Sequence, residues 1–472
     1  MWKRTKIIAT LGPASATQDR MEELIHAGVD LFRVNFSHGT QSQHAAALQA
    51  VRAAEARVGR PVAVCGDLCG PKIRVGLIGN GEVQLLTGHS LTIQRAPVIG
   101  TADRISTTLP ELVDMARPGD AILLADGRLR LEVVTTQPPD QITCRIQVGG
   151  VLSSGKGVNL PHSQLTISSL TEKDLQDVEF ITRHDFDYVA LSFVQQASDV
   201  RQLRSLLAER HCDAQIVAKI EKPQALSRID EIIDAADAIM VARGDLGVEM
   251  DFPSVPITQK MIAHKCERAG KPCIIATEML ESMITSPRPT RAEVSDVANA
   301  VFDRADAVML SAESAIGSFP VAAVTAMRET VIAADKFQDT CDTPVHLELH
   351  QASTTAALAG ALGEIMHLQP VAAVAVFTVS GTTARLIAKN RPPCPIVALS
   401  ASVSTLRRCC LYHGVMPHPV ETPRDTVGAV QLATRVCAQL KLAQPGERII
   451  ILAGHPFDVP GNTNGLVVVT LE

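Results

Sequence analysis

A lysine and a glutamate stand two residues apart inside one apolar run of the sequence. Residues 216–223 read IVAKIEKP, so Lys219 and Glu221 interrupt a stretch that is otherwise typical of a buried strand. Side chains two apart on a strand project from the same face. Burying such charges costs free energy unless they are paired, or unless a metal or an anionic substrate meets them. A buried ion pair would be the simplest explanation if this pattern stood alone.

A second apolar run, residues 238–242, leads directly into another acidic residue. It is followed by Arg243, Gly244 and Asp245. A glutamate and an aspartate at the ends of neighbouring strands commonly hold Mg²⁺, which takes oxygen ligands and keeps other positions for water and substrate phosphates. The two runs together predict a divalent-metal site formed by Glu221 and Asp245, with Lys219 beside it.

Strands that could position these groups recur along the chain, with helical patterns between them. Helices are expected at residues 41–58, 198–209 and 291–302. This alternation is typical of a parallel TIM (β/α)8 barrel, whose active sites lie at the carboxyl ends of the strands. The eight expected strands are residues 6–11, 31–36, 62–67, 188–193, the run that contains Lys219, and residues 238–242, 273–277 and 307–310.

Polar residues gather at the ends of these expected strands. A barrel that served only as a scaffold would not need so many polar groups on one rim, so the pattern favours an active site there. The residues concerned are Arg33, Asn35, Ser37, His38, Asp67, Lys219, Glu221, Asp245, Thr277, Ser311 and Glu313.

The length of 472 residues is too great for one ordinary core and favours about three domains. Short alternating runs at residues 82–86 and 128–134 predict a small β-barrel lid domain over residues 70–168. This insertion follows the third strand, so the TIM barrel is expected to comprise residues 1–69 and 169–340. Thr171 is expected to cap the helix that returns to the barrel.

The C-terminal third of the chain predicts another architecture. A polar stretch at residues 338–344 marks the expected boundary. Beyond it, apolar runs at residues 371–377, 396–399 and 449–452 alternate with helical segments. This pattern predicts an open α/β regulatory domain over residues 341–472.

Composition excludes several classes of partner. The net charge is −6 and the pI is about 6.2, so the chain has no large basic field for nucleic acid or an anionic membrane. Its 11 cysteines include no Cys-x-x-Cys pair, which is typical of reduced thiols. The apolar run near the start is interrupted by Gly12 and Pro13 and is too short for a signal peptide. We therefore expect a cytoplasmic protein without a membrane span.

Five motifs, in order along the chain, resemble those of the pyruvate kinase family. Each motif alone is weak, but their joint order is specific, and the resemblance extends along essentially the whole chain. The motifs are residues 4–7 (RTKI) with 10–13 (TLGP), 33–39 (RVNFSHG), 219–223 (KIEKP), 240–248 (MVARGDLGV) and 289–293 (PTRAE).

The resemblance implies transfer of a phosphoryl group from phosphoenolpyruvate to ADP, the last step of glycolysis, with Mg²⁺ or Mn²⁺ as cofactor. It implies that Lys219 and Arg33 neutralise charge on the phosphoryl group and the developing enolate. Backbone N–H groups at Gly244 and Asp245 would hold the substrate carboxylate. Thr277 would relay a proton to the enolate carbon through water.

Two other classes of protein share parts of this pattern. A metal-dependent aldolase or lyase on a pyruvate-binding barrel also uses a Glu–Asp pair, although the inserted lid and the joint motifs argue against it. An effector-binding pseudoenzyme is expected to have lost Lys219, Glu221 or Asp245, and all three are present.

The nucleotide site carried over from the family consists of Asn35, His38 and Arg74. His38 could equally be a structural histidine. Gln195 and Gln196 stand where many relatives have a basic pair, so one cation expected for the ADP phosphates is missing.

The sequence also departs from many relatives around Asp67. In potassium-requiring members this aspartate is followed by Thr and, a few residues later, by an acidic residue; here Leu68 and Lys72 take these places. The ammonium of Lys72 is a tethered cation that could supply the field needed by the substrate phosphate. We therefore expect that K⁺ is not required, and that Asn35, Ser37 and Asp67 surround Lys72.

A hydroxyl-rich turn in the C-terminal region predicts a regulatory phosphate site. Thr378, Ser380, Gly381, Thr382 and Thr383 follow an expected strand and begin an expected helix, where N–H groups and hydroxyls suit a phosphate. Helix capping alone would also explain them, but the family has an effector site at this loop. Relatives that bind a fructose bisphosphate often carry a basic residue here, and this loop has none. A sugar monophosphate or a nucleotide monophosphate is therefore the expected activator, and the family implies a homotetramer.

Overall fold

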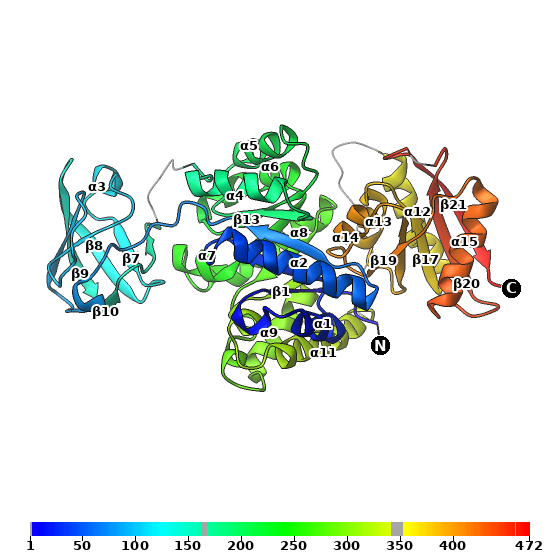
Figure 1. Cartoon of the computed structure of the whole chain (residues 1–472), viewed down its shortest axis with the longest axis horizontal. Helices are drawn as coiled ribbons and strands as arrows, with labels where there is room; N and C mark the ends of the chain where they lie inside the picture. Colours follow the sequence, from blue (N-terminus) through cyan, green and yellow to red (C-terminus); the bar gives the residue numbers. More distant parts are fainter. Residues whose placement is uncertain (1, 162–167, 341–352, 458) are drawn as a thin grey trace.

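The computed structural model describes residues 2–161, 168–340, 353–457 and 459–472. Figure 1 shows three parts in a row: an inserted β region, a central barrel surrounded by helices, and a C-terminal α/β region. The boundary expected at residues 338–344 lies partly outside the described residues. Within them, α11 (Pro320–Gln338) ends before this stretch and α12 (Thr354–Leu368) begins after it.

The central part is a closed barrel of parallel strands in the order β1-β16-β15-β14-β13-β12-β3-β2. All eight expected strands are confirmed. Most of their residues are buried, because helices cover one face and the barrel interior the other, and such strands read as continuous apolar runs. They are β1 (Lys6–Thr10), β2 (Leu31–Asn35), β3 (Ala63–Asp67), β12 (Tyr188–Leu191), β13 (Gln215–Ile220), β14 (Ala238–Ala242), β15 (Cys273–Ala276) and β16 (Ala307–Leu310).

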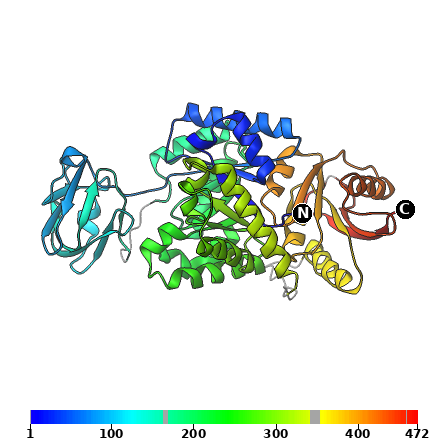
Figure 2. The ribbon, with the colours of Figure 1, turned by 90° about the horizontal axis from the view of Figure 1, so that it is seen from below.

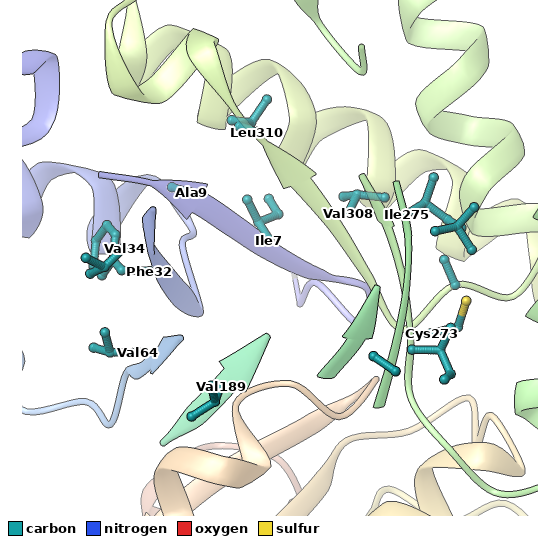
Figure 3. Packing of buried hydrophobic residues seen from close by; sticks show 14 of the residues in the cluster. Ile7, Ala9, Phe32, Val34, Val64, Val189, Cys273, Ile275, Val308 and Leu310 are labelled. Carbon is teal, nitrogen blue, oxygen red and sulfur yellow. The ribbon is translucent and has the colours of Figure 1, made fainter. Parts of the chain in front are cut away.

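The barrel strands pack against the surrounding helices through one apolar core. Figure 3 shows part of it, in which side chains two apart on a strand, such as Ile7 and Ala9 on β1, belong to the same cluster. Alternate residues of a strand share a face, so the other set fills the barrel interior.

Local sequence sets the starts of several barrel helices. Thr40, Thr171 and Thr290 each accept a hydrogen bond from the backbone three residues on, and the side chain there bonds back to the cap. The predicted cap at Thr171 is thereby confirmed. The helices of this part are α1 (Gln18–Ala27), α2 (Gln41–Val58), α4 (Glu172–Thr182), α5 (Ala197–Ala208), α6 (Ile229–Ala235), α7 (Arg243–Glu249), α8 (Ser254–Arg268), α9 (Arg291–Phe302), α10 (Ala312–Ala315) and α11.

The inserted β region forms a six-stranded sheet in the order β11-β7-β8-β9-β5-β6 and a two-stranded sheet of β10 and β4. Residues 73–76 join the two edges of the larger sheet: Val158 N–H donates to Ile73 O at 2.9 Å, and Gly76 N–H donates to Ser106 O at 2.8 Å. The region therefore closes around its own apolar core. Its elements are β4 (Glu82–Leu85), β5 (Ser90–Gln94), β6 (Arg104–Ser106), α3 (Leu112–Met115), β7 (Ala121–Leu124), β8 (Leu129–Gln137), β9 (Gln141–Val148), β10 (Gly150–Ser153) and β11 (Val158–Asn159).

The C-terminal region is an open sheet in the order β19-β18-β17-β20-β21, with helices between the strands. The strands are parallel except β21, which pairs antiparallel with β20. The predicted open α/β architecture is thereby confirmed. Its elements are α12, β17 (Ala373–Phe377), α13 (Thr382–Lys389), β18 (Ile396–Ser400), α14 (Val403–Cys409), β19 (Val415–Pro419), α15 (Thr426–Gln439), β20 (Arg448–Gly454) and β21 (Thr463–Thr470).

The C-terminal region covers the amino ends of the barrel strands. One apolar cluster contains side chains from the barrel interior, such as Tyr188, and from the C-terminal region, such as Tyr412. Tyr188 Oη also donates to Arg408 O at 2.6 Å. The carboxyl ends of the strands therefore face the other side, where the inserted region is attached (Figure 1, Figure 2).

Two further expectations concern thiols and membranes. The ten cysteines within the described residues are all free. Of the helices in the described ranges, none is both long enough and apolar enough to cross a bilayer.

Candidate active site

The ammonium of Lys219 lies at the centre of a buried charged cluster at the carboxyl ends of the barrel strands. Its Nζ lies 3.1 Å from Asp67 Oδ1 and 2.8 Å from Glu221 Oε1. It also donates to Ser192 Oγ at 2.7 Å. The ammonium therefore has two carboxylates and one hydroxyl around it. Lys219 and Glu221 therefore do project together, as their spacing predicted.

Arg33 approaches the other oxygen of the same aspartate. Its Nε lies 2.6 Å from Asp67 Oδ2, and its Nη1 donates to Thr10 Oγ1 at 3.2 Å. Asp67 is 1% exposed and is thus held between two cations from β2 and β13. The carboxylate fixes the plane of the guanidinium and the position of the ammonium at once.

Mutual attraction keeps these groups charged. Burial lowers the pKa of Lys219, but the carboxylates of Asp67 and Glu221 outweigh burial and hold that pKa above its ordinary value. Burial raises the pKa of Asp67, but Lys219 and Arg33 outweigh it and hold that pKa below its ordinary value. Lys219 is therefore a cation and Asp67 an anion around neutral pH.

Glu221 differs from Asp67 in its charge balance. Burial raises its pKa, Lys219 opposes this, and the nearby carboxylate of Asp245 raises the pKa further, so the net shift is upward. Its Oε2 accepts a hydrogen bond from Phe193 N–H at 2.7 Å. Two carboxylates that repel each other at the ends of adjacent strands are stabilised by a divalent cation between them.

The donor set of Glu221 and Asp245 therefore fits Mg²⁺ or Mn²⁺. Within the described residues no third His, Cys, Asp or Glu joins them in a metal-binding group. Such a two-carboxylate site leaves the other coordination positions to water and substrate, which is the usual arrangement for Mg²⁺ bound with a phosphate.

Thr277 and Gly244 are joined by a hydrogen bond. Gly244 N–H donates to Thr277 Oγ1 at 2.7 Å, and the Thr277 hydroxyl donates to Ala276 O at 2.6 Å. Thr277 has a φ of 70°, which is an unfavourable backbone conformation for a β-branched residue. Such strained conformations are found most often at functional sites. Arg243 Nη2 supports this turn by donating to Thr277 O at 2.8 Å. The Gly244 N–H expected to meet the substrate carboxylate is thus used within the protein in this structure.

Lys72 does not lie where the sequence analysis expected it. Its Nζ lies 3.4 Å from Asp245 Oδ1, whereas within the described part of the chain it forms no ion pair or hydrogen bond with Asn35, Ser37 or Asp67. Both oxygens of Asp67 already face Lys219 and Arg33, and Asn35 Oδ1 accepts from Ser37 N–H at 3.1 Å. The expected partners are therefore engaged elsewhere, and Lys72 reaches the other acidic side chain of the rim.

The expected nucleotide residues are spread along the rim and the inserted region. Asn35 ends β2, and His38 is exposed in the turn that follows. Arg74 lies at the root of the inserted region, where its Nη1 donates to Gly155 O at 3.0 Å. Gln196, where a basic residue was expected, accepts from Arg228 Nη1 at 2.7 Å, so a cation reaches this position from another segment.

Three of the five expected effector residues line a cavity of about 180 Å³ in the C-terminal region. Thr378, Ser380 and Thr383 are part of its wall, and Gly381 and Thr382 lie in the same turn without lining it. Of the described lining residues, none is Lys or Arg and one, Glu421, is acidic.

The hydroxyls of this turn all take part in hydrogen bonds within the protein. Thr378 Oγ1 accepts from Gly381 N–H at 2.9 Å, and Ser380 Oγ lies 3.0 Å from Thr382 Oγ1. Thr383 Oγ1 lies 2.6 Å from Thr463 Oγ1. The turn is thus ordered by its own hydrogen bonds, and a phosphate would have to exchange with some of them.

Sequence reasoning missed Ser192 and Phe193, which contact Lys219 and Glu221. A signal was present, because Ser192 is a hydroxyl residue near the end of an expected barrel strand, the position from which the other site residues were chosen. Thr10, which accepts from Arg33, ends β1 and carries the same signal.

These features define an enzyme on a TIM barrel that holds buried cations and paired carboxylates at the carboxyl ends of its strands. Family models described as "Pyruvate kinase, barrel domain" and "Pyruvate kinase, alpha/beta domain" match residues 2–324 and 356–469. The chain belongs to the pyruvate kinase family.

Curated relatives agree along nearly the whole chain. It is 42% identical over 465 residues to the pyruvate kinase of Methylorubrum extorquens, covering 98% of this chain and 96% of the relative. A pyruvate kinase of Agrobacterium vitis is 42% identical over 478 residues, covering 99% and 98%. That of Geobacillus stearothermophilus is 40% identical over 467 residues, covering 98% and 80%.

Membership of the family makes the chain a phosphotransferase that acts on phosphoenolpyruvate and ADP, and the family uses a divalent metal ion. This decides against the aldolase or lyase alternative. It also decides against a pseudoenzyme, because the expected fold and activity are both confirmed.

Proposed function

We propose that the cluster around Lys219 is the phosphotransfer centre of this pyruvate kinase. The observation that supports this most strongly is the position of the Lys219 ammonium between Asp67 and Glu221, with Arg33 on the far oxygen of Asp67. Cations held in this way do not have to be ordered when the substrate binds. Their charge is therefore already in place where negative charge develops in the transition state.

In this proposal Glu221 and Asp245 hold Mg²⁺ or Mn²⁺. When bound, the ion supplies Lewis-acid stabilisation of negative charge on substrate oxygens. The upward pKa shift of Glu221 supports the assignment, because a cation at this position would relieve the repulsion from Asp245. Titration calorimetry should detect Mg²⁺ binding to the parent chain and lose it in Glu221→Gln.

Lys219 and Arg33 act on the phosphoryl group and the developing enolate oxygen. At about 4 Å and an effective dielectric constant near 20, one such charge pair is worth roughly 4 kcal/mol, or about three decades in rate. The planar fork of Arg33 matches phosphoryl oxygens, and Asp67 keeps the fork oriented.

Thr277 delivers the proton that converts the enolate to pyruvate, through a water molecule. Its hydroxyl oxygen is fixed by Gly244 N–H, and its proton points to Ala276 O. Rotation of this single hydroxyl turns the proton toward the substrate. Binding of the substrate carboxylate to the Gly244 and Asp245 N–H groups at the start of α7 would draw the Gly244 N–H away from Thr277 Oγ1.

The nucleotide is assigned to Asn35, His38 and Arg74, with the inserted region as a lid over residues 70–168. The barrel is then residues 1–69 and 169–340, and the regulatory domain residues 341–472. A hydrogen bond from Asn159 Nδ2 to Glu249 Oε1, 2.8 Å long, and the Lys72–Asp245 contact both link the proposed lid to α7. These contacts support a lid that meets the barrel beside the metal ligands.

Lys72 supplies the charge that K⁺ supplies in many relatives, so we propose that this chain does not require K⁺. Its ammonium already reaches the rim at Asp245. Binding of a divalent ion to Asp245 would compete for that carboxylate and leave the Lys72 ammonium to the substrate phosphate.

The hydroxyl-rich cavity is the proposed site of a phosphorylated activator. Its size and its lack of Lys or Arg among the described lining residues suit a sugar monophosphate or a nucleotide monophosphate better than a bisphosphate. The double variant Ser380→Ala and Thr383→Ala should lose activation while keeping the fully activated rate. An unchanged activation curve against a panel of sugar phosphates and AMP would remove this assignment.

We further propose a homotetramer located in the cytoplasm, as the family resemblance implies. Light scattering coupled to size-exclusion chromatography measures the mass directly. A mass of one or two chains at working concentration would contradict the tetramer.

The activity is tested by a coupled assay for pyruvate with phosphoenolpyruvate, ADP and Mg²⁺ in buffer free of K⁺. Turnover that disappears without ADP or without Mg²⁺ is the expected result. No pyruvate under these conditions, but full activity after KCl is added, would overturn the assignment of Lys72 alone. No pyruvate under either condition would overturn the phosphotransfer assignment.

A further inference from the structure

Two residues that follow β12 lie between the catalytic cluster and the root of the inserted region. Ser192 is 2% exposed and Phe193 is 8% exposed, so both are enclosed by protein. Their contacts reach Lys219 and Glu221 on one side, and Leu68 and Gly70 on the other.

The hydroxyl of Ser192 makes two hydrogen bonds of opposite direction. It accepts from Lys219 Nζ at 2.7 Å and donates its single proton to Leu68 O at 2.8 Å. Because that proton is committed to Leu68, a lone pair stays directed at the ammonium. Ser192 is also the uncharged one of the three partners of Lys219, so it orients the ammonium without neutralising its charge.

Phe193 holds Glu221, the carboxylate partner of Lys219, through its backbone N–H. Its φ of 55° is left-handed, a conformation that bulky residues rarely adopt. In this conformation its N–H donates to Glu221 Oε2 at 2.7 Å. With Oε2 fixed, Oε1 is left facing Lys219 at 2.8 Å. A strained backbone that serves a functional carboxylate is the kind of outlier that indicates a function.

Gly70 packs directly on these two residues where the chain leaves the barrel. It has a φ of +66°, and a Cβ there would lie 2.7 Å from Phe193 Cδ2 and 2.9 Å from Ser192 Cβ. Its N–H donates to Asp174 Oδ1 at 3.1 Å, on α4, where the chain returns. The outgoing and returning ends of the inserted region therefore meet at Gly70, which packs on Ser192 and Phe193.

We propose that Ser192 is a positioning residue for Lys219, and that Ser192 and Phe193 together couple the placement of Lys219 and Glu221 to the root of the inserted region. This inference rests on the catalytic role proposed above for Lys219. Because Gly70 packs on the residues that position the ammonium, a shift of the inserted region would change the geometry of the cluster.

The first test removes the hydroxyl. Ser192→Ala should lower kcat by about 10- to 100-fold and change KM for either substrate by less than about threefold, because the ammonium remains but is no longer aimed. Ser192→Thr and Ser192→Val have the same shape and differ in the hydroxyl, so Thr should restore most of kcat and Val should not. Equal kcat for Thr and Val, or a kcat for Ala within about twofold of the parent, overturns the positioning role.

The second test changes Gly70, which packs against Ser192 and Phe193. It does not depend on how the Ser192 variants fold. Gly70→Ala should lower kcat by at least about tenfold, because the new methyl displaces Ser192 and Phe193. Gly155→Ala is the matched control: its φ is +72° and a Cβ there meets nothing within 4 Å, so it has the same backbone cost without the clash. Equal kcat for the two variants overturns the coupling.

Lys219→Met separates this inference from the function on which it rests. If Lys219→Met keeps the parent kcat, the proposed phosphotransfer centre itself is wrong. If Lys219→Met loses turnover while Ser192→Ala does not, only the positioning role fails.

Discussion

Two buried lysine–carboxylate pairs lie at opposite ends of the same barrel. At the amino ends, Lys389 Nζ lies 2.5 Å from Asp306 Oδ2, and both side chains are 1% exposed. At the carboxyl ends, Lys219 lies between Asp67 and Glu221. Each pair joins a lysine to a buried acid. Of these acids, Asp67 and Asp306 have lowered pKa values, whereas the pKa of Glu221 is raised.

At the amino ends the charge is fully matched. Asp306 also accepts from Cys273 N–H at 2.7 Å and faces Arg391 Nη2 at 3.4 Å. Burial raises the pKa of Asp306, but Lys389 and Arg391 outweigh it, and the net shift is downward. This pair fastens the C-terminal region to the barrel and leaves nothing for a ligand to neutralise.

At the carboxyl ends a second acid lies near the one that is paired with the lysine. The pKa of Glu221 is raised by burial and by Asp245 in spite of the Lys219 contact. Glu221 and Asp245 are therefore neighbouring carboxylates, which a divalent cation between them would stabilise. The comparison indicates that a buried ion pair alone does not mark a binding site, and that the nearby second acid, Asp245, distinguishes the carboxyl-end cluster.

The largest effect expected at the amino ends is on stability. Lys389→Met should reduce the free energy of unfolding by about 3 kcal/mol, because Asp306 is left buried with a weaker partner. The kcat of the folded protein should stay within a few-fold of the parent. Urea unfolding with parallel assays measures both quantities, and Lys389→Met combined with Asp306→Asn should recover much of the stability. A large fall in kcat with unchanged stability would break the comparison.

Low pH should reduce the free energy of unfolding through His413, which lies in the C-terminal region at the amino ends of the barrel strands. Burial and then Arg391 lower the pKa of His413 from 6.5 to about 3, against the opposing effect of Asp335 and Asp306, so the ring is neutral in the folded protein. A depressed pKa contributes stability that is present above 6.5 and is lost as pH falls toward 3. Between about pH 7 and pH 5 the loss is about 2 kcal/mol.

The matched variant for this prediction is His413→Gln, which cannot titrate. Its unfolding free energy should fall less than that of the parent over the same pH interval. Equal slopes for the two proteins would show that another group causes the acid sensitivity.

A smaller effect is expected from Lys72, the cation that we propose replaces K⁺. Lys72→Glu should acquire stimulation by K⁺ of about tenfold, since the tethered charge is replaced by an acidic group that can bind the ion. No salt should rescue Lys389→Met in this way, because its position is buried. Strong stimulation of the parent by KCl, but not by a tetraalkylammonium salt of equal ionic strength, would contradict the assignment.

The barrel could be predicted from the sequence because its strands are buried on both faces and read as unbroken apolar runs. Two strands of the C-terminal sheet could not. β19 contains Pro417 and Pro419, which an edge strand tolerates but which break the pattern of a central one. β21 is the antiparallel strand at the other edge, and most of its residues are not buried.

The site shows the same limit. Lys219 and Glu221 could be paired from their spacing, whereas the contacts of Lys219 with Asp67 and Ser192 depend on how β3, β12 and β13 close into the barrel. Lys72 was expected beside Asp67, whereas its observed partner, Asp245, lies on α7, 173 positions along the chain. Asp306 and Lys389 gave no local signal at all, since 83 positions separate them.

The most direct test of the comparison measures kcat and the melting temperature of Lys219→Met and Lys389→Met side by side. Lys219→Met should lose turnover by on the order of 10² to 10⁴ while its melting temperature stays near that of the parent, because transition-state stabilisation is removed and the fold is kept. Lys389→Met should show the reverse. A turnover of Lys219→Met within a few-fold of the parent would contradict the account.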